Sequence, residues 1–295
     1  MFRRTFIRFH MIRYTLLFLS LLAFGQGRAQ NEPKHLYVFK DRNYLCLRAV
    51  DLSDAAVLDS SQLVATYRYS YQKELWNPLR WSETEVVLQI GARWSKCFPA
   101  VLRQIDEQLT RTGDGSAGGR GVFSPRIGTV YENLAKHRLS SEHRYPFSDR
   151  LIRYDEPADT TVWRVGGEAV EVLGYACIPA TATFRGREWT IWFAPDLPAA
   201  ANLWLFRGVP GLILRAETAQ FRFECTAIRP SREAILQLKA NGRKLSRERW
   251  RSLERHYHEE PYRAFNNNDE NAFFEDRFRL NGDNWTIEYN PLELE

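Results

Sequence analysis

The chain has 295 residues, of which 41 are basic and 36 are acidic, giving a formal net charge of +5. Five of the basic residues lie in the first 29 positions, so the rest of the chain carries 36 basic and 36 acidic residues and is formally neutral. A nucleic-acid-binding protein keeps a basic surplus or patch, and we therefore exclude nucleic acid as a partner.

The first segment has the three parts of a secretory signal peptide. Four arginines and no acidic residue precede an eleven-residue apolar run at 14–24. Gly27 and Ala29 then provide the small-x-small pattern that signal peptidase cleaves. Because a membrane-spanning helix needs about 20 apolar residues, we expect a signal peptide over residues 1–29, cleaved after Ala29 or Gln30. No stable transmembrane anchor would remain, and the protein would reside in the periplasm or outside the cell.

Residues 30–295 are predicted to form a single β-rich domain, since all-β domains reach about 200–250 residues. The sequence QLVATYRYSYQ from Gln62 alternates polar and apolar residues, which predicts a half-buried strand. The face that it buries is expected to hold Leu63, Ala65, Tyr67, Tyr69 and Tyr71. Alternation or short apolar runs predict further strands at 36–39, 44–50, 85–91, 161–165, 168–183, 188–194, 221–227 and 285–289.

Helices are predicted in only two places. Apolar residues recur at helical spacing over 99–110, and Gly113 follows as a stop signal. A second, charged helix is predicted over 246–258, with Ser246 as its N-cap and with Trp250, Leu253 and Tyr257 on one side. The fold class is therefore mainly β: an antiparallel curved sheet, half-barrel or sandwich with one or two short helices.

The most distinctive stretch follows the strand at 188–194, which pairs with the preceding strand through a turn at 185–187. It reads Gly208-Val209-Pro210-Gly211-Leu212-Ile213. Proline followed by glycine predicts a type II turn, because proline fixes φ near −65° and glycine accepts a positive φ. Leu212, Ile213 and Leu214 are then expected to form a buried strand.

These features together resemble the GLPGLI family of exported Bacteroidetes proteins, with Val209 where the family name has leucine. The resemblance extends along nearly the whole mature chain: it includes Leu88-Gln89-Ile90-Gly91 with Ser95, Tyr154 with Glu156, Trp163, Gly174-Tyr175 with Cys177, Gly186-Arg187, Trp192-Phe193 before Pro198, and the closing Tyr289-Asn290-Pro291-Leu292-Glu293-Leu294. Ala201-Asn202 departs from the family, which has Gly-Pro there. The resemblance implies export and a predominantly antiparallel β fold, and it supplies no catalytic residues.

Four cysteines lie in the mature chain: Cys46, Cys97, Cys177 and Cys225. Disulfides form in exported proteins, and four cysteines allow three pairings that sequence does not distinguish. The alternative is that some of them are buried free thiols.

A few polar residues are candidates for chemistry. His256 and His258, followed by two glutamates, are the best metal candidates, but residues two apart on a helix point about 200° apart, which favours a solvated helix end. His137 and His143 are expected to be exposed loop histidines. Glu188 and Asp196 are candidate acid–base carboxylates, although a hairpin surface and a turn explain them equally. No cofactor is predicted.

Aromatic residues offer the strongest binding candidates. Trp189, Trp192, Trp204 and Phe206 could form a platform for a ligand, or they could fill the core of the sheet. Trp189 and Phe193 share one face of their strand, so Trp192 points to the other face and is the expected exposed aromatic.

These observations predict a non-catalytic protein that binds either an unknown small ligand on the concave face of its sheet or a protein of the cell envelope. One alternative is a structural component of the envelope or of secreted material. Another is a hydrolase-like enzyme of unrecognised type, with Asp196, His256 and His258 as its candidate residues.

Overall fold

The computed structural model describes residues 46–72, 75–113, 122–123, 126–145, 150–239, 242–259 and 288–294. The described residues all belong to one compact unit, residues 43–295. The predicted signal peptide and the predicted strand at 36–39 lie outside the described residues, as does most of the predicted strand at 285–289.

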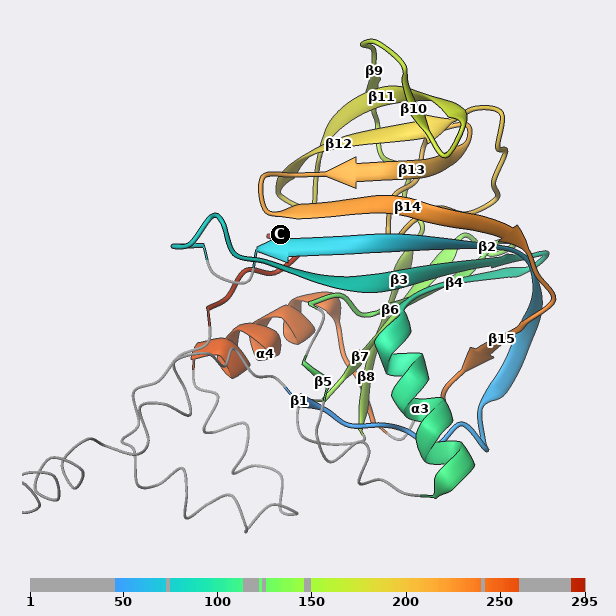
Figure 1. Ribbon diagram of the computed structural model, residues 1–295. Helices are drawn as coiled ribbons and strands as arrows, with labels where there is room; N and C mark the ends of the chain where they lie inside the picture. Colours follow the sequence, from blue (N-terminus) through green and yellow to red (C-terminus); the bar gives the residue numbers. More distant parts are fainter. Residues whose placement is uncertain are drawn as a thin grey trace, which may run out of the picture. The chain divides into compact units, whose positions relative to one another are not determined.

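The described part of the chain is mainly β, as predicted (Figure 1). Its strands are β1 Cys46–Leu47, β2 Ala56–Gln72, β3 Trp81–Gly91, β4 Trp94–Pro99, β5 Val122–Phe123, β6 Thr129–Asn133, β7 Arg138–Arg144, β8 Leu151–Pro157, β9 Arg164–Val165, β10 Val170–Val172, β11 Tyr175–Phe184, β12 Arg187–Ala194, β13 Leu212–Glu217, β14 Phe221–Pro230, β15 Ala234–Gln237 and β16 Arg243–Lys244; its helices are α3 Ala100–Thr112 and α4 Arg247–Glu259.

One 14-stranded sheet dominates the fold, and it has the order β10-β11-β12-β13-β14-β2-β3-β4-β6-β7-β8-β16. In addition, β9 pairs with β11 and β15 pairs with β2, while β1 and β5 form a separate two-stranded sheet. Every pairing is antiparallel except that of β16 with β8. The sheet is open and does not close into a barrel.

The strand predicted from Gln62 is the centre of β2. Its predicted inward face is buried at Ala65, Tyr67, Tyr69 and Tyr71, while Leu63 is only half-buried. The neighbouring strands continue the same layer, with Tyr67 opposite Val86 of β3. The alternation of the sequence therefore specified which face of β2 enters the core.

The hairpin between β11 and β12 has the predicted turn at Arg185 and Gly186. Both residues have a positive φ, 52° and 73° respectively, and they connect the paired residues Phe184 and Arg187. Two-residue hairpins favour this geometry because its twist matches that of the flanking strands, and glycine accepts it without a steric cost.

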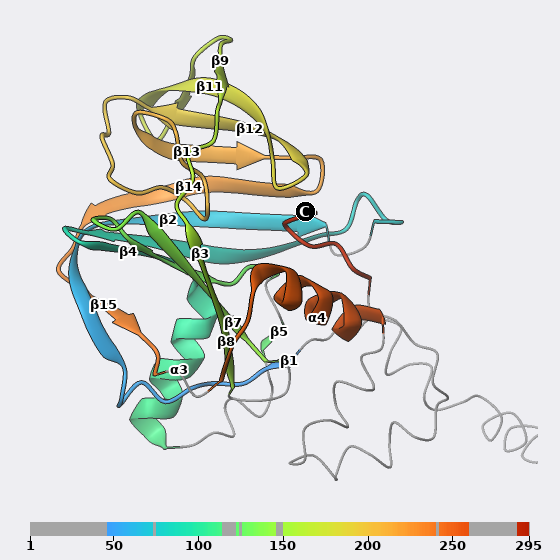
Figure 2. The ribbon, with the colours of Figure 1, turned by 180° about the vertical axis from the view of Figure 1, so that it is seen from behind.

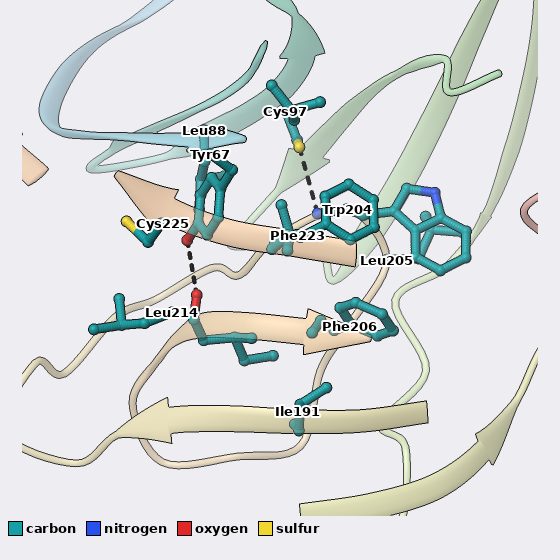
Figure 3. Packing of buried hydrophobic residues seen from close by; sticks show 14 of the residues in the cluster. Tyr67, Leu88, Cys97, Ile191, Trp204, Leu205, Phe206, Leu214, Phe223 and Cys225 are labelled. Atoms are coloured by element: carbon teal, nitrogen blue, oxygen red, sulfur yellow. Dashed lines mark hydrogen bonds between the residues drawn. The ribbon is translucent and has the colours of Figure 1, made fainter. Parts of the chain in front are cut away.

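The sheet curves strongly enough for its two ends to share one hydrophobic cluster. Buried side chains of β4, β6 and β7 belong to the same cluster as those of β11 and β12. The hydroxyl of Tyr67 on β2 donates a hydrogen bond to the carbonyl of Ile213 on β13, which is not a neighbouring strand, at 2.8 Å (Figure 3).

The space enclosed by this curvature is filled by the chain itself. Residues 201–206, which connect β12 to β13, are all buried, and each side chain from Leu203 to Phe206 is at most 4% exposed. The backbone N–H of Trp204 lies 3.4 Å from the sulfur of Cys97 on β4, so the connection between β12 and β13 contacts β4 across the core (Figure 3). The concave face that the sequence suggested for a ligand is therefore occupied by the protein's own core.

The segment 208–213 differs from its prediction in one respect. Leu212, Ile213 and Leu214 form the expected buried strand, each with no exposed surface. The predicted type II turn is wrong, because Gly211 has a φ of 156° and the N–H of Leu212 donates to the carbonyl of Leu197 instead of closing a turn. Glycine is still needed at 211, since a Cβ there would overlap the carbonyl of Ala194.

Both helices form where the sequence predicts them, and both pack beside the half of the sheet that contains β3, β4 and β6–β8 (Figure 2). Helix α3 packs on β3 and β4 and ends at Gly113, whose φ is 65°. Helix α4 packs on β8, and its Ser246 hydroxyl accepts a hydrogen bond from the N–H of Arg249 at 3.3 Å, as expected of an N-cap.

The closing segment 289–294 is held against the start of β12. The guanidinium of Arg187, 8% exposed, donates to the side chain of Asn290 at 2.9 Å and to the carbonyls of Pro291 and Leu292. Glu293 pairs with Arg247 of α4 at 2.7 Å. Arg187 and the closing residues, which both contribute to the family resemblance, therefore contact each other directly.

Candidate functional site

A groove of about 890 Å³ lies between α4 and the edge of the sheet at β8 and β16. Its size falls within the range of about 300–1,000 Å³ that is usual for ligand sites. The described residues that line it are Tyr145, Arg150, Leu151, Ile152, Gly242, Arg243, Leu245, Arg249, Ser252, Leu253 and His256.

Helix α4 supplies one wall because of its residue spacing. Arg249, Ser252 and His256 follow one another at intervals of three and four, so they lie along one stripe of the helix, and Leu253 lies between this stripe and the packed side. The adjacent stripe packs Trp250 and Tyr257 against Ile152 and Tyr154 of β8. The predicted apolar side of this helix therefore fixes the direction in which its polar stripe faces.

The opposite wall depends on a glycine. Gly242 comes so close to β8 that a Cβ there would overlap the backbone of Leu151. This approach lets β16 pair in parallel with β8, with Arg243 opposite Ile152. The pairing places Arg243 at the groove, next to Leu151 and Ile152, which are both 2% exposed or less.

The charge of the groove is one-sided. Arg150, Arg243 and Arg249 are exposed, His256 is half-buried, and the described residues that line the groove include no aspartate or glutamate. Within the described part of the chain, neither Arg243 nor Arg249 takes part in an ion pair. A guanidinium presents a planar set of donors that matches carboxylate and phosphate oxygens, so this groove can hold an anion next to an apolar surface.

Of the two histidines proposed as a metal pair, only His256 lines the groove. His258 is buried on another side of α4, where its Nδ1 lies 3.0 Å from the carbonyl of Glu288 and its ring contacts Tyr289. The described residues contain no group of three or more potential metal ligands. The helical divergence expected from the sequence separates the pair, and the expectation of a solvated helix end is wrong for His258.

His137 and His143 have different surroundings. His137 is exposed in the turn between β6 and β7, as predicted, with a φ of 49°. His143 is on β7, and its ring stacks on Trp250 at 4.3 Å and on Tyr154 at 5.7 Å. Burial lowers the pKa of His143 to about 3. The expectation that His143 is an exposed loop residue is wrong, because α4 covers this part of β7.

A second, small cavity of about 30 Å³ lies beneath α4, and its lining includes His143 and Glu254. The hydroxyl of Tyr289 donates to the carboxylate of Glu254 at 3.2 Å. Burial raises the pKa of Glu254 to about 7. Sequence analysis did not select Glu254, since a glutamate on a charged helix carries no signal of burial until the helix is placed.

Ion pairs are buried between α3 and the sheet. Asp106 of α3 receives two hydrogen bonds from Arg144 of β7, one of them 2.7 Å long, and both side chains are at most 5% exposed. Close by, Arg153 pairs with Glu142 at 2.7 Å. Lys96 donates to the carbonyl of Leu236 at 2.7 Å, and burial lowers the pKa of Lys96 to about 8. A separate cavity of about 30 Å³ lies beside these groups and is the size of a few water molecules.

The candidate aromatic platform belongs almost entirely to the core. Trp189, Trp204 and Phe206 are at most 4% exposed and contact one another, with ring centroids 4.9–5.7 Å apart. Trp192 points to the other face, as its strand position predicts, and is half-buried beneath the guanidinium of Arg215, 4.5 Å from the ring centroid. The alternative that these residues form the core of the sheet describes three of the four.

The cysteines that the structure describes are free thiols. Cys97, Cys177 and Cys225 are buried on three separate strands, and the Cys46 side chain lies outside the described atoms. Burial raises the pKa of Cys97 and of Cys225 to about 12. Of the two alternatives left open by the sequence, the buried free thiol describes these three cysteines.

The two candidate acid–base carboxylates lie in different surroundings. Glu188 is exposed on β12 and accepts a hydrogen bond from Thr183 of the paired strand. Asp196 is exposed in the turn after β12, where the N–H of Leu197 donates to the carbonyl of Ala194. Neither residue lines the groove.

Comparisons with known proteins add little. No family model matches the chain, and no curated protein matches it. Among the described residues, no helix is both long enough and apolar enough to cross a membrane.

The solved structures that are similar to the chain include two crystal forms of one protein, "Structure of PNGF-II in P21 space group" and "Structure of PNGF-II in C2 space group". The similarity covers 65% of this chain, with TM-scores of 0.45 and 0.46 and sequence identities of 12% and 11%. The chain spans about a third of the length of these structures, 33% and 32%. A likeness this low carries no argument about function.

Proposed function

We propose that this protein is an exported, non-catalytic binding protein of the GLPGLI family, and that the groove between α4 and β8/β16 binds an organic anion with an apolar part. The observation that carries the binding proposal is that two exposed guanidiniums, Arg243 and Arg249, line the groove beside apolar side chains, with no acidic residue among the described residues of the groove. The arginine-rich start and apolar run of the first 29 residues support export.

The charge of the groove contrasts with that of the rest of the protein. Beyond the first 29 residues the chain has equal numbers of basic and acidic residues. Several arginines elsewhere are paired, such as Arg144 with Asp106 and Arg247 with Glu293. A local excess of positive charge favours an anionic ligand and raises its local concentration.

The apolar side chains of the groove support an apolar part of the ligand. Leu245 and Leu253, both half-buried, provide aliphatic surface beside the arginines, and half-buried Tyr145 adds an aromatic ring. Burial of apolar surface contributes about 25 cal/mol per Å². A ligand that combines a carboxylate or phosphate with an alkyl or ring portion would use both features.

The test is a titration of the full chain with three probes that share an alkyl chain: octyl phosphate, octanoate and neutral octyl glucoside. Binding is measured by isothermal titration calorimetry. We expect the two anions to bind and the neutral probe to bind at least about tenfold more weakly, a difference of about 1.4 kcal/mol. Equal binding of all three would contradict a groove selective for anions.

A pair of double variants places the binding in the groove. Arg243→Ala with Arg249→Ala removes two of the guanidiniums, and we expect a loss of affinity for the anionic probes of about tenfold or more. Arg68→Ala with Lys239→Ala removes the same charge from exposed positions that do not line the groove. Equal losses in the two variants would mean that the anions bind through net charge rather than in the groove.

A further inference from the structure

The turn that leads into β3 exposes three large apolar side chains within five residues. Leu75 is 46% exposed, Trp76 75% and Leu79 91%. Residues 75–79 carry no charge. Monomeric proteins expose large apolar residues singly without consequence, but several together mark a surface for interaction.

Hydrogen bonds fix this turn from both sides. The carbonyl of Pro78 accepts from the side chains of Gln72 and Trp81, both at 3.1 Å, and the carbonyl of Asn77 accepts from the N–H of Arg80 at 3.0 Å. The N–H of Leu75 donates to the carboxylate of Glu288 at 2.7 Å. The turn is therefore held in place by its backbone while its apolar side chains are exposed.

The size of the exposed surface argues against a protein partner. A stable protein–protein interface buries about 800 Å² and 20–30 residues on each side, far more than three side chains provide. Insertion of a few apolar residues into the surface of a bilayer needs no complementary partner surface, and tryptophan is favoured at the level of the lipid headgroups. The guanidinium of Arg222 lies 4.7 Å from the ring centroid of Trp81, the first residue of β3 after the turn.

We propose that the turn formed by Leu75, Trp76, Asn77, Pro78 and Leu79 inserts into the surface of a lipid bilayer. Its apolar side chains enter the boundary between headgroups and acyl chains, and the backbone hydrogen bonds hold them in the inserted orientation. The attachment is peripheral and reversible, because three side chains bury far less apolar surface than a spanning helix.

The test measures co-sedimentation of the full chain with vesicles of phosphatidylethanolamine and phosphatidylglycerol, and with vesicles of phosphatidylcholine. The test variant is Trp76→Ser with Leu79→Ser. The matched control is Val57→Ser with Val162→Ser, since these valines are 68% and 88% exposed and lie elsewhere in the chain. We expect the test variant to lose about tenfold or more in vesicle partition, and the control to partition like the wild type.

A second readout reports insertion directly. Lipids brominated on their acyl chains quench a tryptophan that enters the bilayer, and we expect this quenching to be larger in the wild type than in Trp76→Phe. Thermal unfolding of each variant, followed by circular dichroism, is expected to match the wild type because the altered side chains are exposed.

Three outcomes would overturn the proposal. The first is a wild-type protein that does not sediment with either kind of vesicle. The second is equal partition of wild type, test variant and control, which would mean that another segment, such as the apolar run at 14–24, causes the binding. The third is quenching by brominated lipids that is equal in the wild type and Trp76→Phe, which would mean that Trp76 does not enter the bilayer.

Discussion

The two halves of the large sheet are stabilised in different ways. The aromatic half, β11–β14 with residues 201–206, buries Trp189, Trp204, Phe206 and their neighbours in one hydrophobic cluster. The charged half, β4 and β6–β8 with α3 and α4, buries ion pairs and titratable groups, among them Asp106 with Arg144. The groove and the two water-sized cavities described above lie in the charged half.

This difference indicates which half can change in function without losing the fold. A packed aromatic cluster tolerates little change in volume, so the aromatic half is a scaffold. Buried charges contribute little net stability, since desolvation offsets their attraction. The buried charges lie between α3 and the sheet and beneath α4, in the same half as the groove, as expected of a half that is shaped by the requirements of a site.

The largest expected effect is in the aromatic half. Phe206→Ala removes a fully buried ring that contacts Trp189 and Trp204, and we expect a loss of about 3–5 kcal/mol in the free energy of unfolding. Urea denaturation followed by circular dichroism measures it. Val162→Ala, at a position that is 88% exposed, should change stability by less than about 0.5 kcal/mol. A small loss for Phe206→Ala would mean that residues 201–206 do not fill the core.

In the charged half, Asp106→Ala is also expected to cost about 3–5 kcal/mol, because Arg144 is left as an uncompensated buried charge. The comparison is sharpened by the double variant Asp106→Leu with Arg144→Met, which removes both charges. Its expected loss is only about 1–3 kcal/mol, since the N–H of Val50 and the carbonyl of Arg48 lose their partners. A double variant as unstable as Asp106→Ala would show that the loss of stability does not come from the uncompensated charge of Arg144.

The third prediction concerns pH and the cavity beneath α4. Glu254 has a pKa raised from 4.5 to about 7. The unfolded chain therefore releases this proton at lower pH than the folded protein, and stability is lost as the pH rises from 4.5 through about 7. Glu254→Gln should gain more than about 1 kcal/mol relative to the wild type across this interval, measured by urea denaturation at a series of pH values.

In the same cavity, His143 makes the stability of the protein depend on pH in the opposite direction. Its pKa is lowered from 6.5 to about 3, so the unfolded chain binds a proton that the folded protein excludes. Stability is lost as the pH falls below 6.5 toward about 3. His143→Phe keeps the stacking with Trp250 and should weaken this acid loss. Identical pH profiles for wild type and variant would contradict the burial of the imidazole.

The smallest expected effect is at the start of α4. Ser246→Ala removes the N-cap hydrogen bond to Arg249 and should cost about 1 kcal/mol. Ser246→Asp keeps an acceptor at this position and should restore most of the loss. The same urea denaturation measures both, and a Ser246→Asp variant no more stable than Ser246→Ala would argue against the cap.

The sequence by itself determined the local structure of this protein. Alternation around Gln62 specified the buried face of β2, and the apolar spacing of 246–258 specified which side of α4 packs. The Arg185–Gly186 turn was also predictable, because hairpins of two residues require a positive φ. All of these signals depend on residues within a few positions of one another.

Only the tertiary structure decided which of these elements form a site. The groove joins residues near 150 to residues near 250, and its shape depends on the close approach of Gly242 to Leu151. The burial of His143 and Glu254 likewise depends on the docking of α4 against β7 and β8. Periodicity describes one element at a time, whereas the enclosure of a side chain, and with it the pKa, is set by contacts between distant segments.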